Sequence, residues 1–203
     1  MKLVMIWDVT CRPCLPSLWS ALVSVAILVL FPYQARPQSL LRMDRSMVAF
    51  VSDAVQERIE ATNTKATGVL HLDDRSFAVQ IPVRSFEGFN SPLQREHFNE
   101  NYMESRVHPN AVFQGRIIEA VDLRKEGSYE VRAKGVITIH GVEHERIVTC
   151  AVVVAEDGVR VTSIFEVLLD DHHIRVPGIV RLKISPMIIV QVDLLFRASA
   201  VKQ

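Results

Sequence analysis

The chain has 203 residues, of which 23 are basic and 23 are acidic, so its formal net charge at pH 7 is zero. A protein that binds nucleic acid through the phosphates needs a basic face, and the balanced charge argues against that class. For this length we expect one domain after removal of any targeting segment.

The amino-terminal 35 residues have the pattern of a segment that targets a chain for export. Basic residues precede an uncharged apolar run at 15–31, which Pro32 ends shortly before Ala35. This order is typical of a secretory signal. The run is close to the lower length limit of a membrane-spanning helix, so a retained anchor is the first alternative and a buried helix the second. We predict a signal peptide or membrane anchor at 1–35 and one domain at 36–203.

The cysteines agree with export. Cys11 and Cys14 form a C-x-x-C pair, which near a βαβ pattern in a cytosolic chain would suggest redox chemistry. Here the pair lies within the predicted signal, so cleavage would leave Cys150 as the single thiol. We expect Cys150 to be a small buried hydrophobic residue within an apolar strand.

After this segment, apolar residues recur with a period of two, which is typical of β-strands. We predict strands at 48–51, 56–72, 76–83, 111–121, 129–139, 145–154, 159–169 and 186–197. The stretch 91–102 differs, because a capping serine followed by proline predicts one short amphipathic helix. Strands of this length joined by tight turns, with closure removing the exposed edges, predict an all-β, antiparallel, up-and-down barrel of about eight strands.

The apolar faces of the strands define the inside of this barrel. An eight-stranded barrel has room for packed side chains or for one small ligand. Small residues expected on the inward face favour a cavity, namely Gly115, Ala133, Gly135, Ala151 and Ser163. On the predicted helix, His97 and Tyr102 are candidate polar contacts to a ligand head group near the mouth. The candidate apolar contacts are Phe77, Phe113, Ile117, Val131, Ile137, Phe165, Val190 and Leu194.

The histidines do not have a typical metal-site spacing. His140 and His144 are four apart, but the glycine between them predicts a hairpin in which the two rings need not converge. The adjacent pair at 172–173 would point to opposite faces of a strand. A site that combines one of that pair with His97 or His108 stays an alternative, and a solvated, charged loop is the favoured interpretation. We therefore predict no metal and no cofactor.

No motif indicates catalysis. The sequence contains no G-x-S-x-G and no glycine-rich phosphate loop after a strand. An active site needs a base oriented toward a nucleophile, and no such pair is indicated. We predict that the protein is not an enzyme and has no catalytic residues.

Seven segments along nearly all of the predicted mature chain are similar to segments of one known family. They are VAFVSD at 48–53, IEATN at 59–63, QREHFNENYMES at 94–105, HPNAVF at 108–113, GVITIHGV at 135–142, FEV at 165–167 and IRVP at 174–177. With these segments the chain resembles the YceI-like family, in the shorter form common in Bacteroidetes-type bacteria. One departure is DDHH at 170–173, where the family usually has an SDYGI-like stretch.

The resemblance implies a lipocalin-like barrel with a helix packed near its mouth, and binding of a long apolar molecule such as an isoprenoid chain. We therefore expect a periplasmic or secreted protein that holds an isoprenoid or another lipid inside the barrel. The alternative is a filled barrel that acts as an envelope stress or interaction module without a bound lipid. Membrane association through an uncleaved amino terminus and a homodimer stay open.

Overall fold

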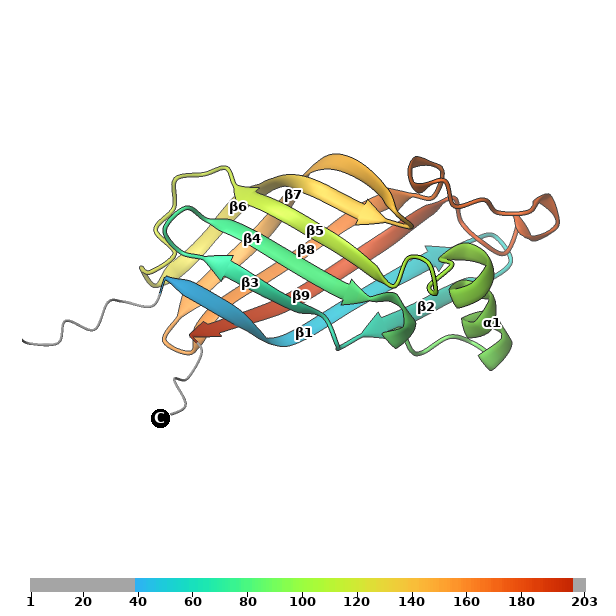
Figure 1. The fold of residues 1–203 in the computed structure, drawn as a ribbon, viewed down its shortest axis with the longest axis horizontal. Helices are drawn as coiled ribbons and strands as arrows, with labels where there is room; N and C mark the ends of the chain where they lie inside the picture. The colour runs from blue at the N-terminus through green and yellow to red at the C-terminus, as the bar shows by residue number, and fades with distance from the viewer. Residues whose placement is uncertain (1–38, 199–203) are drawn as a thin grey trace, which may run out of the picture. The chain divides into compact units, whose positions relative to one another are not determined.

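The computed structural model describes residues 39–198, which form an antiparallel β-barrel with helical segments at one end (Figure 1). The predicted signal or anchor at 1–35 lies outside the described residues. The strands are β1 (Leu40–Asp53), β2 (Arg58–Asn63), β3 (Thr67–His71), β4 (Ser76–Pro82), β5 (Asn110–Ile117), β6 (Gly127–Ile139), β7 (Val142–Ala155), β8 (Gly158–Leu168) and β9 (Met187–Ala198). The helical segments are η1 (Val83–Ser85), α1 (Pro92–His97), the π-helical turn η2 (Phe98–Tyr102), η3 (Asp170–His172) and η4 (Gly178–Val180).

Pairing between the first and last strands closes the barrel. Consecutive strands from β3 to β9 pair antiparallel, and β9 also pairs with β1. On its other edge, β1 pairs with β3 through residues 40–42 and with β2 through residues 48–53. Because β2 and β3 pair with different parts of the same edge of β1, together they take the place of one strand. The nine strands therefore form an eight-stranded barrel. The prediction of an antiparallel barrel of about eight strands with one short helix is confirmed.

The predicted strand at 56–72 is divided into β2 and β3, and a buried amide accounts for the break. Asn63 ends β2, and its Nδ2 donates to the carbonyl of Pro82 at 2.8 Å. Its Oδ1 accepts from the backbone N–H of Lys65, also at 2.8 Å. The side chain therefore supplies partners to backbone groups that lie outside the β-ladder at this point.

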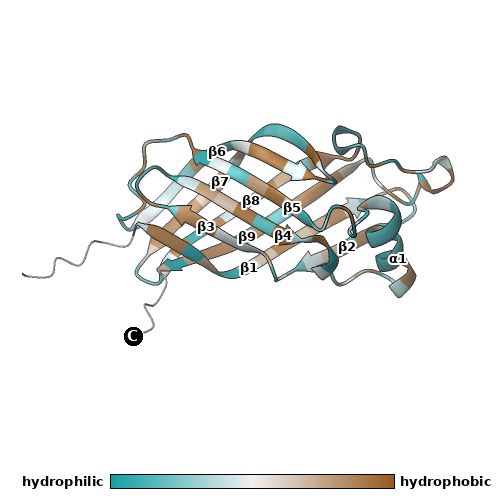
Figure 2. Cartoon of the chain, viewed as in Figure 1, coloured by the Kyte–Doolittle hydropathy of each residue, from teal (hydrophilic) through white to brown (hydrophobic). Residues whose placement is uncertain are grey.

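Apolar and polar residues alternate along the strands, as the bands of Figure 2 show. The apolar side chains of this pattern, such as Val131 and Val152, are buried inside the barrel. Gly115 and Gly135 face each other across β5 and β6, and a Cβ on either would lie 2.2 Å from a carbonyl oxygen of the opposite strand. Ala133, another of the small residues, lies in the wall of a cavity inside the barrel, as expected. The two glycines allow two strand backbones to approach closely. The expectation that Ala151 faces inward is wrong, because it is exposed on the outer face of β7.

The helical segment begins as the sequence predicts. Ser91 caps α1, since its Oγ accepts from the backbone N–H of Gln94 at 3.2 Å, and Pro92 is the first helical residue. The helix continues as η2 to Tyr102. Within residues 39–198, no helix has both the length and the apolar character needed to cross a membrane.

Several connections gather at the end of the barrel that carries α1, which we call the mouth (Figure 1). They are η2, the segment with η3 and η4, and the β6–β7 turn. Near the mouth, β7 and β8 are not joined by a ladder, because they pair only over the five residue pairs nearest their shared turn. Ser163 Oγ instead donates to Thr149 O at 2.6 Å, and the guanidinium of Arg146 donates to Glu166 O. Side chains therefore help to close the wall on this side.

Candidate ligand cavity

The barrel encloses a cavity of about 540 Å³ that extends from the mouth along the inner faces of the strands. At the mouth it is bordered by residues of α1 and by Val180 and Lys183 of the loop around η4. Deeper in the barrel its wall includes Val152 and Phe196. The volume lies within the range of roughly 300–1,000 Å³ that is usual for small-molecule sites.

All ten residues that the sequence singled out lie in the wall of this one cavity. Eight of them come from five different strands, β4, β5, β6, β8 and β9, and His97 and Tyr102 lie at the mouth on α1 and η2. The eight strand residues are Phe77, Phe113, Ile117, Val131, Ile137, Phe165, Val190 and Leu194. Contact between these residues and a ligand stays a prediction.

Four further phenylalanines, which the sequence did not single out, line the cavity beneath the helical segment. Phe50 lies at the centre of this aromatic cluster, with ring centroids 5.2 Å from Phe86, 5.9 Å from Phe89 and 5.3 Å from Phe98. Alternation with Val48 is the signal that could have identified Phe50 as inward-facing. Phe86 and Phe89 lie outside the strands, where no periodicity assigns a side chain to a face.

A hydrogen-bonded group of polar side chains connects α1 to the β1–β2 turn at the mouth. Glu57 Oε1 accepts from Gln94 Nε2 at 2.9 Å and from Asn90 Nδ2 at 3.2 Å. Gln94 Oε1 in turn accepts from the backbone N–H of Asn90 at 3.1 Å. Glu57 and Gln94 border the cavity, as does Lys183 on the η4 loop. The mouth therefore presents charged and amide groups to anything that enters.

The polar groups deeper in the wall have protein partners. Ser163 Oγ donates to a β7 carbonyl, and Ser52 Oγ accepts from the backbone N–H of Ser185 at 2.9 Å. Cys150 lines the cavity as a buried free thiol, as expected, and burial raises its pKa, so that it stays protonated at neutral pH. The interior suits an apolar group that needs no hydrogen bonds.

The histidines adopt an arrangement that the sequence did not reveal. His172 is only 1% exposed, so the expectation of a solvated loop at this residue is wrong. Its Nδ1 donates to Val142 O at 3.2 Å, and burial is the main cause that lowers its pKa. His144 packs against His172 with 5.0 Å between ring centroids, whereas His140 packs against His108 at 4.8 Å.

Such a closed antiparallel barrel around an apolar cavity defines the lipocalin-like class of fold. The sequence model of the YceI-like domain matches residues 41–196, and the chain belongs to this family. No curated protein matches the chain in sequence.

Three solved structures illustrate the fold. A polyisoprenoid binding domain from Saccharophagus degradans is 13% identical, with a TM-score of 0.68, over 80% of this chain and 99% of that one. BcnA from Burkholderia cenocepacia is 16% identical, with a TM-score of 0.64, over 75% of this chain and 96% of that one. A YceI protein from Campylobacter jejuni is 13% identical, with a TM-score of 0.53, over 66% and 82%.

Proposed function

We propose that the protein is an exported binding protein that holds an apolar ligand, an isoprenoid chain or another lipid, inside the barrel. The observation that carries this proposal is the cavity of about 540 Å³, whose wall is built from inward apolar side chains of strands all around the barrel. The Saccharophagus degradans domain, which has the same fold, is described as polyisoprenoid-binding, and this supports the isoprenoid class.

The affinity would come from removing the tail of the ligand from water. Each buried methylene contributes roughly 0.8 kcal/mol, so a five-carbon unit contributes about 4 kcal/mol before the cost of ordering the chain. The apolar wall would select a ligand by the length and thickness of its tail and not by its polar groups. His97 and Tyr102 lie where a head group would remain, and burial raises the pKa of Tyr102, which keeps its hydroxyl as a neutral donor.

In this proposal the protein acts by carrying or storing its ligand, and it catalyses no reaction. Export through the segment at 1–35 would place it in the periplasm or outside the cell, and retention of that segment would attach it to the membrane. The alternative of a filled barrel requires large side chains to occupy the interior, and the cavity weighs against it.

The test is mass spectrometry of organic extracts from the protein purified from the envelope of its own host. We expect about one equivalent per chain of an isoprenoid or fatty-acyl species. An unrelated envelope protein of similar size, purified in parallel, controls for lipid carried along without specific binding. Empty extracts after gentle purification, together with no rise in Tm when isoprenoids are added, would contradict the proposal.

A further inference from the structure

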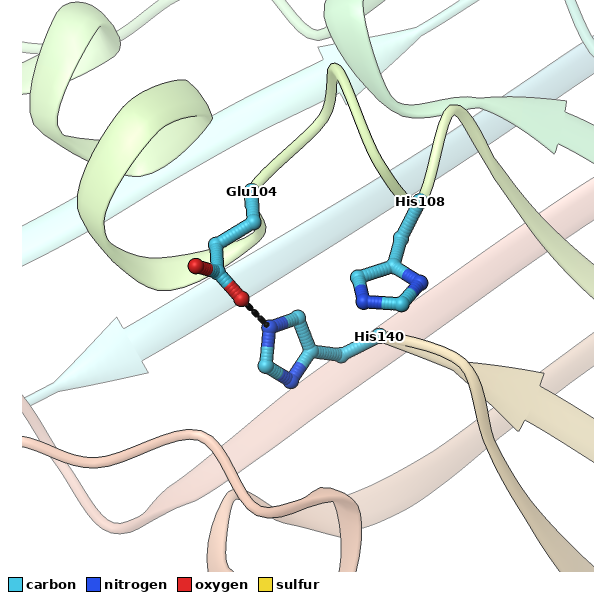
Figure 3. A group of neighbouring side chains, drawn as sticks. All are labelled: Glu104, His108 and His140. Atoms are coloured by element: carbon cyan, nitrogen blue, oxygen red, sulfur yellow. Dashed lines mark hydrogen bonds and ion pairs between the residues drawn. The ribbon is translucent and has the colours of Figure 1, made fainter.

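Three side chains of metal-ligand type meet at the mouth, outside the wall of the cavity (Figure 3). Glu104 and His108 lie between η2 and β5, and His140 lies at the β6–β7 turn. The carboxylate of Glu104 and the ring of His108 both point toward the ring of His140. We propose that these three residues bind one divalent transition-metal ion of the zinc type. This inference is independent of the proposed lipid ligand.

The geometry is close to that of an open zinc site. One ligand atom from each residue lies within 4.8 Å of the other two, and His140 Nε2 is 2.8 Å from Glu104 Oε2. With zinc–ligand distances of about 2.0–2.2 Å, tetrahedral ligand atoms lie about 3.4 Å apart. Small rotations of the His108 and Glu104 side chains would therefore close the site. Two histidines and one carboxylate leave the fourth position for water.

The second ring nitrogen of His140 has the hydrogen bond that a metal-bound imidazole usually makes. Its Nδ1 lies 3.2 Å from the backbone carbonyl of His172, which can only accept, so Nδ1 carries a proton. This bond fixes the ring and directs Nε2 toward the site. The side chain of His140 is 14% exposed, whereas Glu104 is exposed, so the site opens to solvent on the side of the carboxylate.

Two of the three residues that would bind the ion have an uncommon backbone conformation. Glu104 has φ 42° and His140 has φ 52°, both in the left-handed region that residues other than glycine rarely adopt. The next residue, Gly141, has φ 73°, and a Cβ on it would lie 2.6 Å from Cε1 of His108. A glycine at this position lets the His108 ring lie against the turn. At positions 140 and 141 the positive φ values are those of a two-residue type I′ turn between β6 and β7, and this turn fixes where the His140 ring lies.

An ion at this position would connect the segment after η2 to the β6–β7 turn. Tyr102 and Met103, which directly precede Glu104, line the cavity. The ion would therefore hold one part of the mouth in place, and we expect it to raise Tm. The same contacts would also form if His140 were protonated and paired with Glu104 without a metal. A direct binding measurement separates the two arrangements.

The test is calorimetric titration of zinc chloride into the full-length chain carrying Cys11→Ser and Cys14→Ser, because the C-x-x-C thiols would themselves bind zinc. We expect one equivalent of zinc per chain and an increase in Tm. His108→Gln and His140→Asn should each weaken binding by at least about 100-fold, because even residues that only orient a ligand cost 10–100-fold when removed. Asparagine tolerates the positive φ of position 140.

His173→Asn is the matched control, because this exposed histidine has φ 56° and its substitution should leave zinc binding unchanged. A second measurement does not depend on the folding of any histidine variant. Zinc added to the same Cys11→Ser, Cys14→Ser chain should shift the ring-nitrogen NMR signals of His108 and His140 but not that of His173. Absence of stoichiometric binding overturns the proposal. So does binding that His108→Gln and His140→Asn leave unchanged, or a zinc-induced shift confined to other histidines.

Discussion

The ring of Phe98 is stacked on the ring of Phe50, with 5.3 Å between the centroids and 18° between the planes. This contact connects η2 to β1 across the mouth of the cavity. Phe86 and Phe89 pack against both rings at centroid distances between 5.1 and 5.9 Å. The aromatic cluster therefore covers the cavity and also holds the helical segment on the barrel.

Removal of one ring from this cluster should weaken the packing between helix and barrel. We predict that Phe98→Ala lowers the free energy of unfolding by about 2–3 kcal/mol, less than the 3–5 kcal/mol of a fully buried phenylalanine because Phe98 is half-buried. Urea denaturation measures the change. Val107→Ala, at a position that is 71% exposed, should change it by less than about 0.5 kcal/mol. Equal effects of the two substitutions would show that the cluster does not stabilise the fold.

A larger side chain inside the cavity should compete with the ligand. Ala133 is 5% exposed and lies in the cavity wall on β6, so we predict that Ala133→Phe lowers affinity for a long-chain isoprenoid or fatty-acyl probe at least about tenfold. Ala151→Phe makes the same change on the outer face of β7, where the alanine is exposed, and should leave binding unchanged. Fluorescence titration of the probe measures both affinities. If both variants bind like the parent protein, the ligand does not occupy this cavity.

The barrel and much of the cavity wall could be predicted because strand periodicity assigns side chains to faces. Phe113 and Val190 were identified as inward-facing from alternation alone, and both lie in the wall. Phe86 and Phe89 could not be identified in this way, because they lie in a connection where the direction of a side chain depends on tertiary contacts. Alternation predicts the face on which Gly115 and Gly135 lie. It cannot predict that they face each other across β5 and β6, because this contact depends on the register of the two strands.

The histidine arrangement was beyond sequence reasoning for a related reason. His172 is buried by contacts with β7 that include a bond to Val142, which is 30 residues away in the chain. Glu104 and His140 are 36 residues apart and meet only because the segment after η2 lies against the β6–β7 turn. Local spacing of ligands could not indicate either contact, since each depends on how connections fold over the mouth.

Burial of His172 should make stability fall as the solution becomes acidic. Its folded-state pKa is lowered below the ordinary value of about 6.5, mainly by burial and also by the nearby His144, and the bond to Val142 opposes the shift. Below about pH 6.5 the unfolded chain therefore binds more protons at this residue than the folded chain does. The contribution of His172 to the free energy of unfolding is therefore complete above that pH and is lost as the pH falls toward the folded-state pKa. This residue changes the free energy of unfolding by at most about 1.4 kcal/mol per pH unit.

We predict that His172→Asn reduces the dependence of the unfolding free energy on pH between about pH 7 and 5, whatever its effect at neutral pH. Urea denaturation across this range measures the slope. His173→Asn removes an exposed histidine next to it and should retain the slope of the parent protein. A slope that is the same in all three proteins would mean that His172 is not responsible.

The amide of Asn63 should be important for stability, because its side chain is fully buried and bonded at both ends. Its exposed fraction is 0%, and it joins the end of β2 to Pro82 and Lys65. Asn63→Ala removes the partners of the Pro82 carbonyl and of the Lys65 backbone N–H, and a buried group left without a partner costs about 1–3 kcal/mol. We predict a loss of about 2–3 kcal/mol in urea denaturation, and a negligible loss for Asn101→Ala at an exposed position on η2.

Asn63→Asp separates the two hydrogen bonds. The carboxylate still accepts from the N–H of Lys65, but it faces the carbonyl of Pro82 without a proton to donate. Burial and this carbonyl favour the protonated acid in the folded protein, so its folded-state pKa should lie above the unfolded value of about 3.9. The aspartate variant should therefore approach the stability of the parent protein as the pH falls toward 4 and lose it again as the pH rises. A difference between Asn63→Asp and the parent that is constant from pH 4 to 7 would show that the donor bond to Pro82 is not what Asn63 contributes.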